Sequence, residues 1–160
     1  MKLNLLNKSA TTSLFLILFL LFGLISVKGE KVEEEKSLYI RLGGYEAISL
    51  VVNDFAPKLF NDPQVGSFFK GMGTDTRNSF IQKNINLVCN VTGGPCKIIS
   101  RPAKTIHSGL GITEKEFNIV VNHLVDTLNK FKVPKAEKEE LLAIIGTLKP
   151  DIVQSEIDKQ

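Results

Sequence analysis

The sequence predicts one all-α domain, and three observations support this prediction. Of the 160 residues, 43% are hydrophobic and 23% are charged, which is typical of a globular chain with one core. From Leu38 onward, apolar residues recur at intervals of three and four, the spacing of one face of a helix rather than that of a strand. Clusters of glycine, proline and asparagine separate these apolar stripes and mark helix ends.

Four apolar stripes define four long helices. Thr113, followed three residues later by Glu116, predicts a capping box at the start of the third. Pro134 suits the first turn of the fourth, which should end near Pro150. The stripes are, in order, Ile48, Val51, Val52, Phe55 and Leu59; Phe80, Asn84, Leu87 and Val88 with Ile81 and Ile85 beside them; Phe117, Val120, Val121, Leu124, Leu128 and Phe131; and Leu141, Leu142, Ile144, Ile145 and Leu148.

The segments between the stripes contain strong helix breakers. Gly43-Gly44 ends a short opening segment, and Asn61-Asp62-Pro63 ends the first long helix. Thr92-Gly93-Gly94-Pro95 ends the second, because two glycines and a proline do not continue a helix. No long stripe lies between Pro95 and Thr113, so we expect a nonhelical segment that contains His107. A structureless segment of that length in a compact domain is usually functional.

The first 29 residues have the pattern of an export signal. Two lysines precede the apolar run of residues 14–27, which is shorter than the ~20 residues of a spanning helix but suits a signal-peptide core. The protein is therefore expected to be periplasmic or secreted, or, if the signal is not cleaved, anchored in a membrane through this run. We expect four parts: a signal peptide or anchor (1–29), a charged linker (30–37), the helical domain (38–153) and a C-terminal tail (154–160).

Charge and reactive side chains exclude several classes of function. The formal net charge of +3 arises from residues 1–29, which hold three lysines and no acid, so the rest of the chain is balanced. A nucleic-acid partner, which needs clustered positive charge, is therefore not expected. The two histidines and two cysteines lack the spacing of a zinc site, and no glycine-rich phosphate loop opens a helix. A hydrolase or a nucleotide enzyme is disfavoured.

The histidines and cysteines each leave alternatives open. Cys89 and Cys96 form either a disulfide, which an exporting signal favours, or a pair of free, partly buried thiols. His123 lies within the third stripe and is expected to be a helix-surface or partly buried side chain. His107 lies near glycines that let the backbone adopt many conformations, but spacing alone does not assign its role.

An ordered series of short motifs resembles the group I truncated haemoglobins. The resemblance covers about residues 38–153 and implies a two-over-two helical sandwich around one haem b per chain, with almost no proximal helix. The motifs are Leu38-Tyr39-Ile40-Arg41-Leu42-Gly43-Gly44, Ala47-Ile48, Val51-Val52-Asn53-Asp54-Phe55, Ser67-Phe68-Phe69, Thr92-Gly93-Gly94-Pro95, Lys104-Thr105-Ile106-His107, Phe117, His123-Leu124 and Val133-Pro134.

The resemblance also implies a set of site residues. His107 would be the proximal ligand of the haem iron, since one neutral imidazole is sufficient to hold haem. Lys83 would reach a haem propionate, approach the iron or remain solvated. The implied haem contacts are Phe68, Phe69, Phe80, Lys83, Asn84, Val88, Phe117 and Leu124.

The distal pocket departs from the family pattern. The resemblance places Ala56, Phe80 and Asn84 in this pocket, with Ala56 where the family carries a tyrosine and Asn84 where it often carries glutamine. Each hydrogen-bond donor in a dry distal pocket stabilises bound O₂ by about 1 kcal/mol or more. Loss of the tyrosine hydroxyl should therefore speed O₂ release and autoxidation.

Three functions remain open. The first is reversible binding of O₂, NO or CO at haem, including oxygen transport. The second is a redox enzyme on the same scaffold, an NO dioxygenase or a peroxidase, supplied by an unidentified redox partner. A peroxidase usually uses a distal histidine, and the expected second helix has none. The third is a haem-free helical module that binds an apolar ligand or a partner.

Overall fold

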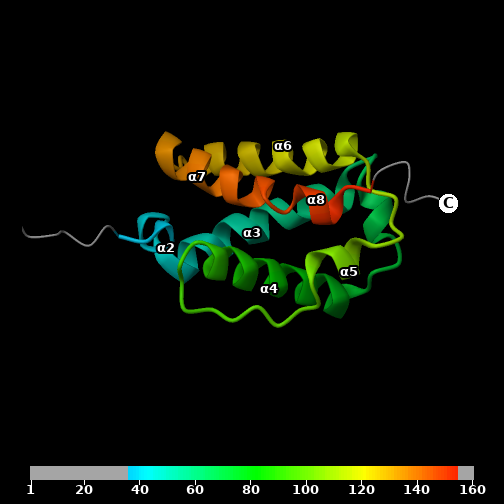
Figure 1. Ribbon diagram of the computed structural model, residues 1–160, viewed down its shortest axis with the longest axis horizontal. Coiled ribbons are helices and arrows are strands. Elements are labelled where there is room, and N and C mark those ends of the chain that lie inside the picture. The colour runs from blue at the N-terminus through cyan, green and yellow to red at the C-terminus, as the bar shows by residue number, and fades with distance from the viewer. Residues whose placement is uncertain (1–35, 155–160) are drawn as a thin grey trace, which may run out of the picture. The chain divides into compact units, whose positions relative to one another are not determined.

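The computed structural model describes residues 36–154, and every regular element in this range is helical (Figure 1). The expected signal or anchor, all of the linker before Lys36 and the tail beyond Gln154 lie outside the described residues. Within them, no helix combines the length and apolar character that a membrane span needs. The elements are α2 (Leu38–Arg41), α3 (Gly44–Asn61), the 3₁₀ helix η1 (Gly66–Phe69), α4 (Thr74–Val91), α5 (Ala103–His107), α6 (Glu114–Lys130), α7 (Lys135–Gly146) and α8 (Lys149–Ile152).

The long helices form two pairs. Helix α3 packs against both α4 and α6, and α6 packs against α7 (Figure 1). Among the short helices, α2 packs against α3 and α7, and α5 packs against α8. The expected all-α fold, a two-over-two sandwich, is therefore confirmed.

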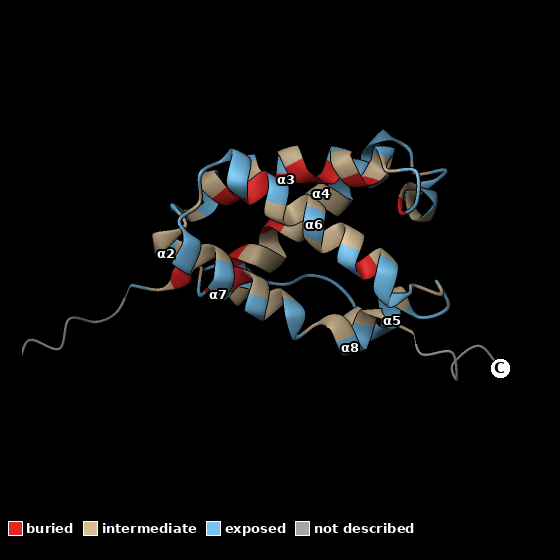
Figure 2. Ribbon diagram, turned by 90° about the horizontal axis from the view of Figure 1, so that it is seen from above, coloured by how far each residue is buried: buried red, intermediate tan, exposed pale blue. Residues whose placement is uncertain are grey.

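Helix α3 supplies the centre of the core. Its buried side chains follow the predicted stripe, and Figure 2 shows them along the length of the helix. Three buried clusters result, each between different elements. They are Ile48, Val52, Ile85 and Cys89; Leu38, Leu128 and Leu141; and Phe55, Leu59 and Val65. Each large apolar side chain buried here stabilises the fold by roughly 1.5–3 kcal/mol.

The predicted capping box starts α6 as expected. The Thr113 hydroxyl oxygen accepts the backbone N–H of Glu116 at 3.3 Å, and the Glu116 carboxylate accepts the Thr113 N–H at 2.8 Å. Two of the unpaired N–H groups at the helix start are thereby satisfied.

Two helix boundaries differ from the sequence prediction. The fourth helix, expected to extend to about Pro150, ends at Gly146, and Pro150 lies in the first turn of α8, where its missing N–H costs nothing. The segment from Pro95 to Thr113, expected to be nonhelical, contains the five-residue helix α5. A helix of that length spans little more than one turn, so it leaves no recognisable stripe.

A disulfide joins Cys89, in the last turn of α4, to Cys96 in the following segment. The turn between them requires glycine at position 94, because an added Cβ would lie 2.5 Å from the Tyr39 ring and 2.6 Å from the Cys89 carbonyl oxygen. The Tyr39 N–H also donates to the carbonyl of Thr92 at 2.8 Å. The start of the segment that leads to His107 is thus attached to both α4 and α2.

We predict that removal of this crosslink destabilises the domain. Closing so short a loop should contribute about 2–3 kcal/mol to the free energy of unfolding through the entropy of the unfolded chain. The variant Cys89→Ala/Cys96→Ala should therefore have a free energy of unfolding lower by about that amount. Its urea unfolding midpoint should fall accordingly. The unsubstituted protein treated with a dithiol reductant is the matched control. Equal midpoints for its oxidised and reduced forms would contradict the prediction.

Candidate functional site

His107 is the last residue of α5 and is half-buried. Its Nδ1 lies 2.8 Å from the carbonyl oxygen of Ala103, four residues earlier. A carbonyl only accepts, so Nδ1 carries the proton and the lone pair of the neutral imidazole lies on Nε2. This is the arrangement in which a histidine binds a metal through Nε2, with its other nitrogen held by the backbone.

Contacts on both sides hold α5 in place. Upstream, the disulfide fixes the segment at Cys96, and Asn90 Nδ2 donates to the Cys96 carbonyl at 2.9 Å. Downstream, the Gly111 N–H donates to Gln154 Oε1 at 2.5 Å, and the Gln154 N–H donates to the Ile112 carbonyl at 2.9 Å. Gln154, expected to begin the C-terminal tail, instead holds the histidine segment.

Apolar side chains of the same segment are partly open to solvent. Ile98, Ile106 and Leu110 retain 44%, 42% and 46% of their exposure. Ile106 precedes the histidine, and the Leu110 N–H donates to the His107 carbonyl at 3.2 Å. The imidazole therefore lies on a segment with an incompletely covered apolar surface, which a flat apolar ligand could cover.

An aromatic cluster joins α3, η1 and α4. The rings of Phe60, Phe69 and Phe80 meet edge to face, with centroids 5.2–5.6 Å apart. Phe68, Phe69, Phe80 and Leu124 all pack against the buried cluster around Phe55 and Leu59. Four of the predicted haem contacts are thus brought to one part of the core. Phe60 was missed because it lies off the apolar stripe of its helix.

The polar group expected in the distal pocket is bonded within its own helix. Asn84 Nδ2 donates to the carbonyl of Phe80 at 2.9 Å. One amide N–H is therefore used by the backbone, while Oδ1 and the second N–H have no hydrogen bond in the described part of the chain. Ala56 is completely buried and offers only a methyl group.

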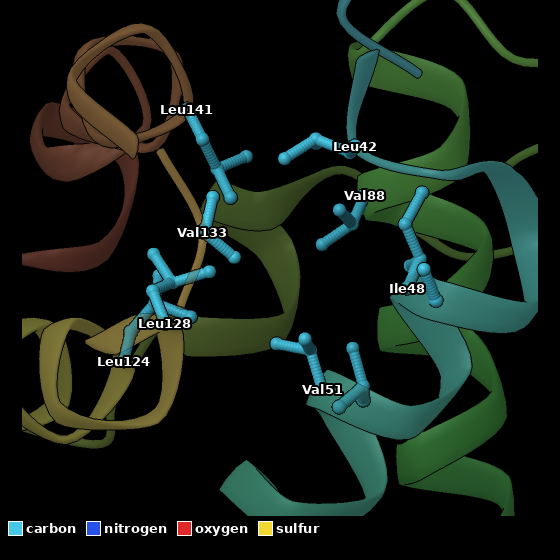
Figure 3. Close-up of a pocket in the computed structure, with 10 residues that line it drawn as sticks. Leu42, Ile48, Val51, Val88, Leu124, Leu128, Val133 and Leu141 are labelled. Carbon is cyan, nitrogen blue, oxygen red and sulfur yellow. The ribbon is translucent and has the colours of Figure 1, made fainter. Parts of the chain in front are cut away.

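The remaining predicted contacts lie elsewhere. Val88 lines an apolar cavity of about 30 Å³ between α3, α4, α6 and α7, whose wall also includes Leu124 of the previous group (Figure 3). Phe117 is buried, with Lys149 Nζ 5.9 Å from its ring centroid. Lys83 is exposed. The cavity wall consists of Leu42, Ala47, Ile48, Val51, Val52, Val88, Leu124, Leu128, Val133 and Leu141.

Between residues 36 and 154, no three histidine, cysteine, aspartate or glutamate side chains lie close enough together to bind a metal ion. If His107 holds a metal, most of the other ligands must come from a bound group. A porphyrin supplies four nitrogens and needs one axial imidazole.

His123 has a different role. Its Nε2 lies 2.8 Å from Asp62 Oδ2, and Asp62 Oδ1 accepts the backbone N–H groups of Gln64 and Val65 at 2.8 and 2.9 Å. The pKa of Asp62 is lowered, first by the hydrogen bond from His123 and then by those from the Val65 and Gln64 N–H groups. The pair connects α6 to the turn that follows α3.

A two-over-two helical sandwich with one Nε2-directed histidine on a minimal helix defines the class of truncated globins. The sequence matches the bacterial-like globin family over residues 37–154, which is most of the chain. The protein belongs to this family, and the resemblance inferred from its motifs is confirmed. Membership implies a haem cofactor and haem-based binding of gaseous ligands.

Relatives and solved structures agree with this assignment. A group 1 truncated hemoglobin of Mycolicibacterium paratuberculosis is 35% identical over 79% of this chain and 90% of its own length. The 2/2 hemoglobin of Synechococcus sp. PCC 7002, solved in the cyanomet state with covalently attached heme, is 26% identical, with a TM-score of 0.67 over 74% of this chain and 98% of that one. The Fe(III) truncated hemoglobin of Tetrahymena pyriformis shares the fold, with 24% identity and a TM-score of 0.69 over 75% of this chain and all of that one.

We predict that Asp62 makes stability depend on acid pH. A carboxyl whose pKa is lower in the folded state stabilises the fold above its unfolded value, 3.8, and this contribution is lost as pH falls through the lowered folded value. Asp62→Asn should be less stable than the parent at pH 7, and the difference should shrink as pH falls below about 4.

Urea unfolding at several pH values between 2.5 and about 7 checks this. The matched control is Asp126→Asn, which changes an exposed carboxylate on α6. An Asp62→Asn difference that stays constant down to the lowest pH would show that the carboxylate charge is not what stabilises this turn.

Proposed function

We propose that the protein binds haem b through His107 Nε2 and reversibly binds a diatomic gas, O₂, NO or CO, at the iron. The observation that carries the proposal is the hydrogen bond from His107 Nδ1–H to the Ala103 carbonyl, which leaves the lone pair on Nε2 available to a metal. Family membership supports it, since globins hold haem by a proximal histidine. Bound haem supplies an iron coordination position for the gas.

Side chains of the histidine segment and of the aromatic cluster fit such a group. Ile98, Ile106 and Leu110 offer apolar surface for one side of a flat ring. The cluster of Phe60, Phe69 and Phe80 offers aromatic edges on α3, η1 and α4. Lys83 is exposed and has no ion pair within residues 36–154, so it is free to meet a propionate.

The distal residues favour rapid release of O₂ over tight storage. Ala56 carries no donor, and Asn84 already gives one N–H to the Phe80 carbonyl. Bound O₂ carries partial negative charge and is retained by distal donors, so a pocket with few donors releases it quickly. At this face the chain contributes the methyl group of Ala56 and, as a donor, only the second N–H of Asn84.

NO dioxygenation, the oxidation of NO to nitrate by O₂, is the alternative enzymatic function on the same haem scaffold. It requires an electron donor. A peroxidase is less well supported, since α4 carries no histidine to act as an acid and base. A haem-free module remains the outcome if no haem is taken up.

We further propose export, with residues 1–29 as a signal peptide or an anchor. The Cys89–Cys96 disulfide supports this, because such bonds persist mainly in oxidising compartments outside the cytosol.

We predict that His107→Gly removes the axial ligand, so that the Soret band of the haem-reconstituted protein weakens or shifts. Free imidazole added to the buffer should restore the band by filling the space of the lost ring. The matched control is His123→Gly, which should keep the parent spectrum because that ring is held by Asp62. Equal spectra for the parent and His107→Gly would move the iron ligand to another residue, and no Soret band in any of them would leave the haem-free module.

We predict that Ala56→Tyr slows O₂ release. A new hydroxyl donor worth about 1 kcal/mol should slow dissociation by about fivefold. The control is Ala56→Phe, which adds the same ring without the hydroxyl, and stopped-flow displacement of O₂ by CO measures both rates. Equal O₂ dissociation rates for the tyrosine and phenylalanine variants would show that position 56 does not face the bound gas.

A further inference from the structure

Helix α5 has few contacts of its own that could hold His107 in place. None of its five residues is buried, and the residue at its N-cap, Pro102, provides no side-chain cap. A helix of little more than one turn does not form by itself in water. The position of the histidine therefore depends on what α5 and the residues next to it contact.

One residue makes a two-point contact with the chain just after α5. The Gly111 N–H donates to Gln154 Oε1 at 2.5 Å, and the Gln154 N–H donates to the Ile112 carbonyl at 2.9 Å. The side chain and the backbone of Gln154 thus bind two consecutive residues. We call this pair of hydrogen bonds the Gln154 clasp.

The Gln154 clasp lies close to the histidine along the chain. Gly111 follows His107 by four residues, and between them the Leu110 N–H donates back to the His107 carbonyl at 3.2 Å. Gly109 and Gly111 have φ angles of 77° and 66°, which glycine adopts without strain. The clasp therefore fixes the far end of the turn that begins at His107.

Helix α8, which precedes Gln154, is itself attached to a long helix. Lys149 Nζ lies 2.5 Å from Glu114 Oε1, at the start of α6, and 5.9 Å from the Phe117 ring centroid. Helix α5 also packs against α8, and the two lie side by side in Figure 2. The clasp thus joins the histidine segment to an element that the helical sandwich holds.

We propose that Gln154 is a positioning residue for His107. The Gln154 clasp holds the turn after the histidine, and through it sets where Nε2 meets the haem iron. Loss of the clasp weakens the iron–histidine bond and speeds haem release. This inference rests on the proposed function, because it requires haem at His107. Gln154 acts through residues 107–111 and not by touching the haem.

The test removes the acceptor of the clasp and then restores it. Gln154→Met removes the oxygen at nearly the same side-chain size, whereas Gln154→Glu retains an oxygen that accepts the Gly111 N–H. The matched control is Gln82→Met, because Gln82 Nε2 also makes two hydrogen bonds, to Tyr45 Oη at 2.8 Å and Asn86 Oδ1 at 3.0 Å, between α3 and α4.

Three measurements are made on each haem-reconstituted protein. The rate of haem transfer to excess apomyoglobin reports haem release. Resonance Raman spectra of the ferrous protein report the iron–histidine stretching band. Amide hydrogen exchange at Gly111, followed by NMR in the CO-bound protein, reports whether the clasp is formed. Far-UV circular dichroism confirms the helix content of each variant.

We expect Gln154→Met to transfer haem about fivefold faster than the parent, as loss of one hydrogen bond allows. Its iron–histidine band should shift, and its Gly111 amide should exchange faster. Gln154→Glu should return all three measurements toward the parent values. Gln82→Met should keep the parent's haem transfer rate and iron–histidine band, even if it unfolds more readily. These two readouts separate positioning from a general loss of stability.

Two results would overturn the positioning role. One is a parent Gly111 amide that exchanges as fast as an unbonded amide. The other is an unchanged haem transfer rate and iron–histidine band in Gln154→Met. If that variant does not fold, Gln154→Asn replaces it and is judged in the same way, because its amide is one methylene shorter. Failure of the parent to take up haem would overturn the proposed function itself, which the Soret band reports independently of Gln154.

Discussion

The packing of one helix on two neighbours is the constraint on which this domain depends. Helix α3 contacts α4 on one side and α6 on the other, and its buried stripe contributes to two of the three core clusters. Ala56 lies at full burial on this helix. The position that the family resemblance places on the distal side is therefore part of the buried face of α3, so a change of side chain there also acts on the core.

The histidine segment is organised by a different principle. Helix α5 is too short to be stable alone, since isolated helices of so few residues do not form in water. Its position comes from covalent and hydrogen-bonded attachments at its two ends, the disulfide at Cys96 and the link between Gly111 and Gln154. The helical sandwich thus carries a histidine segment whose position is set by a few contacts.

Much of the scaffold could be predicted from the sequence, because long helices bury regular stripes. The stripe from Ile48 to Leu59 and the capping box at Thr113 both predict local structure from neighbouring residues. The candidate site was harder to predict from the sequence. Helix α5 is shorter than the pattern that would reveal it, and the contact between Gly111 and Gln154 joins residues 43 apart.

The separate placement of ion pairs and unpaired lysines has a consequence for how such a protein can change. The carboxylates and cations that join α3 to α6, or α2 to α7, are partners across the fold, so a substitution at one leaves the other unpaired. Lys83 on α4 and Lys104 on α5 are exposed and have no ion pair among residues 36–154. Their charges can be altered in number or sign at little cost to folding, so the surface around each can diverge while the helical scaffold stays the same.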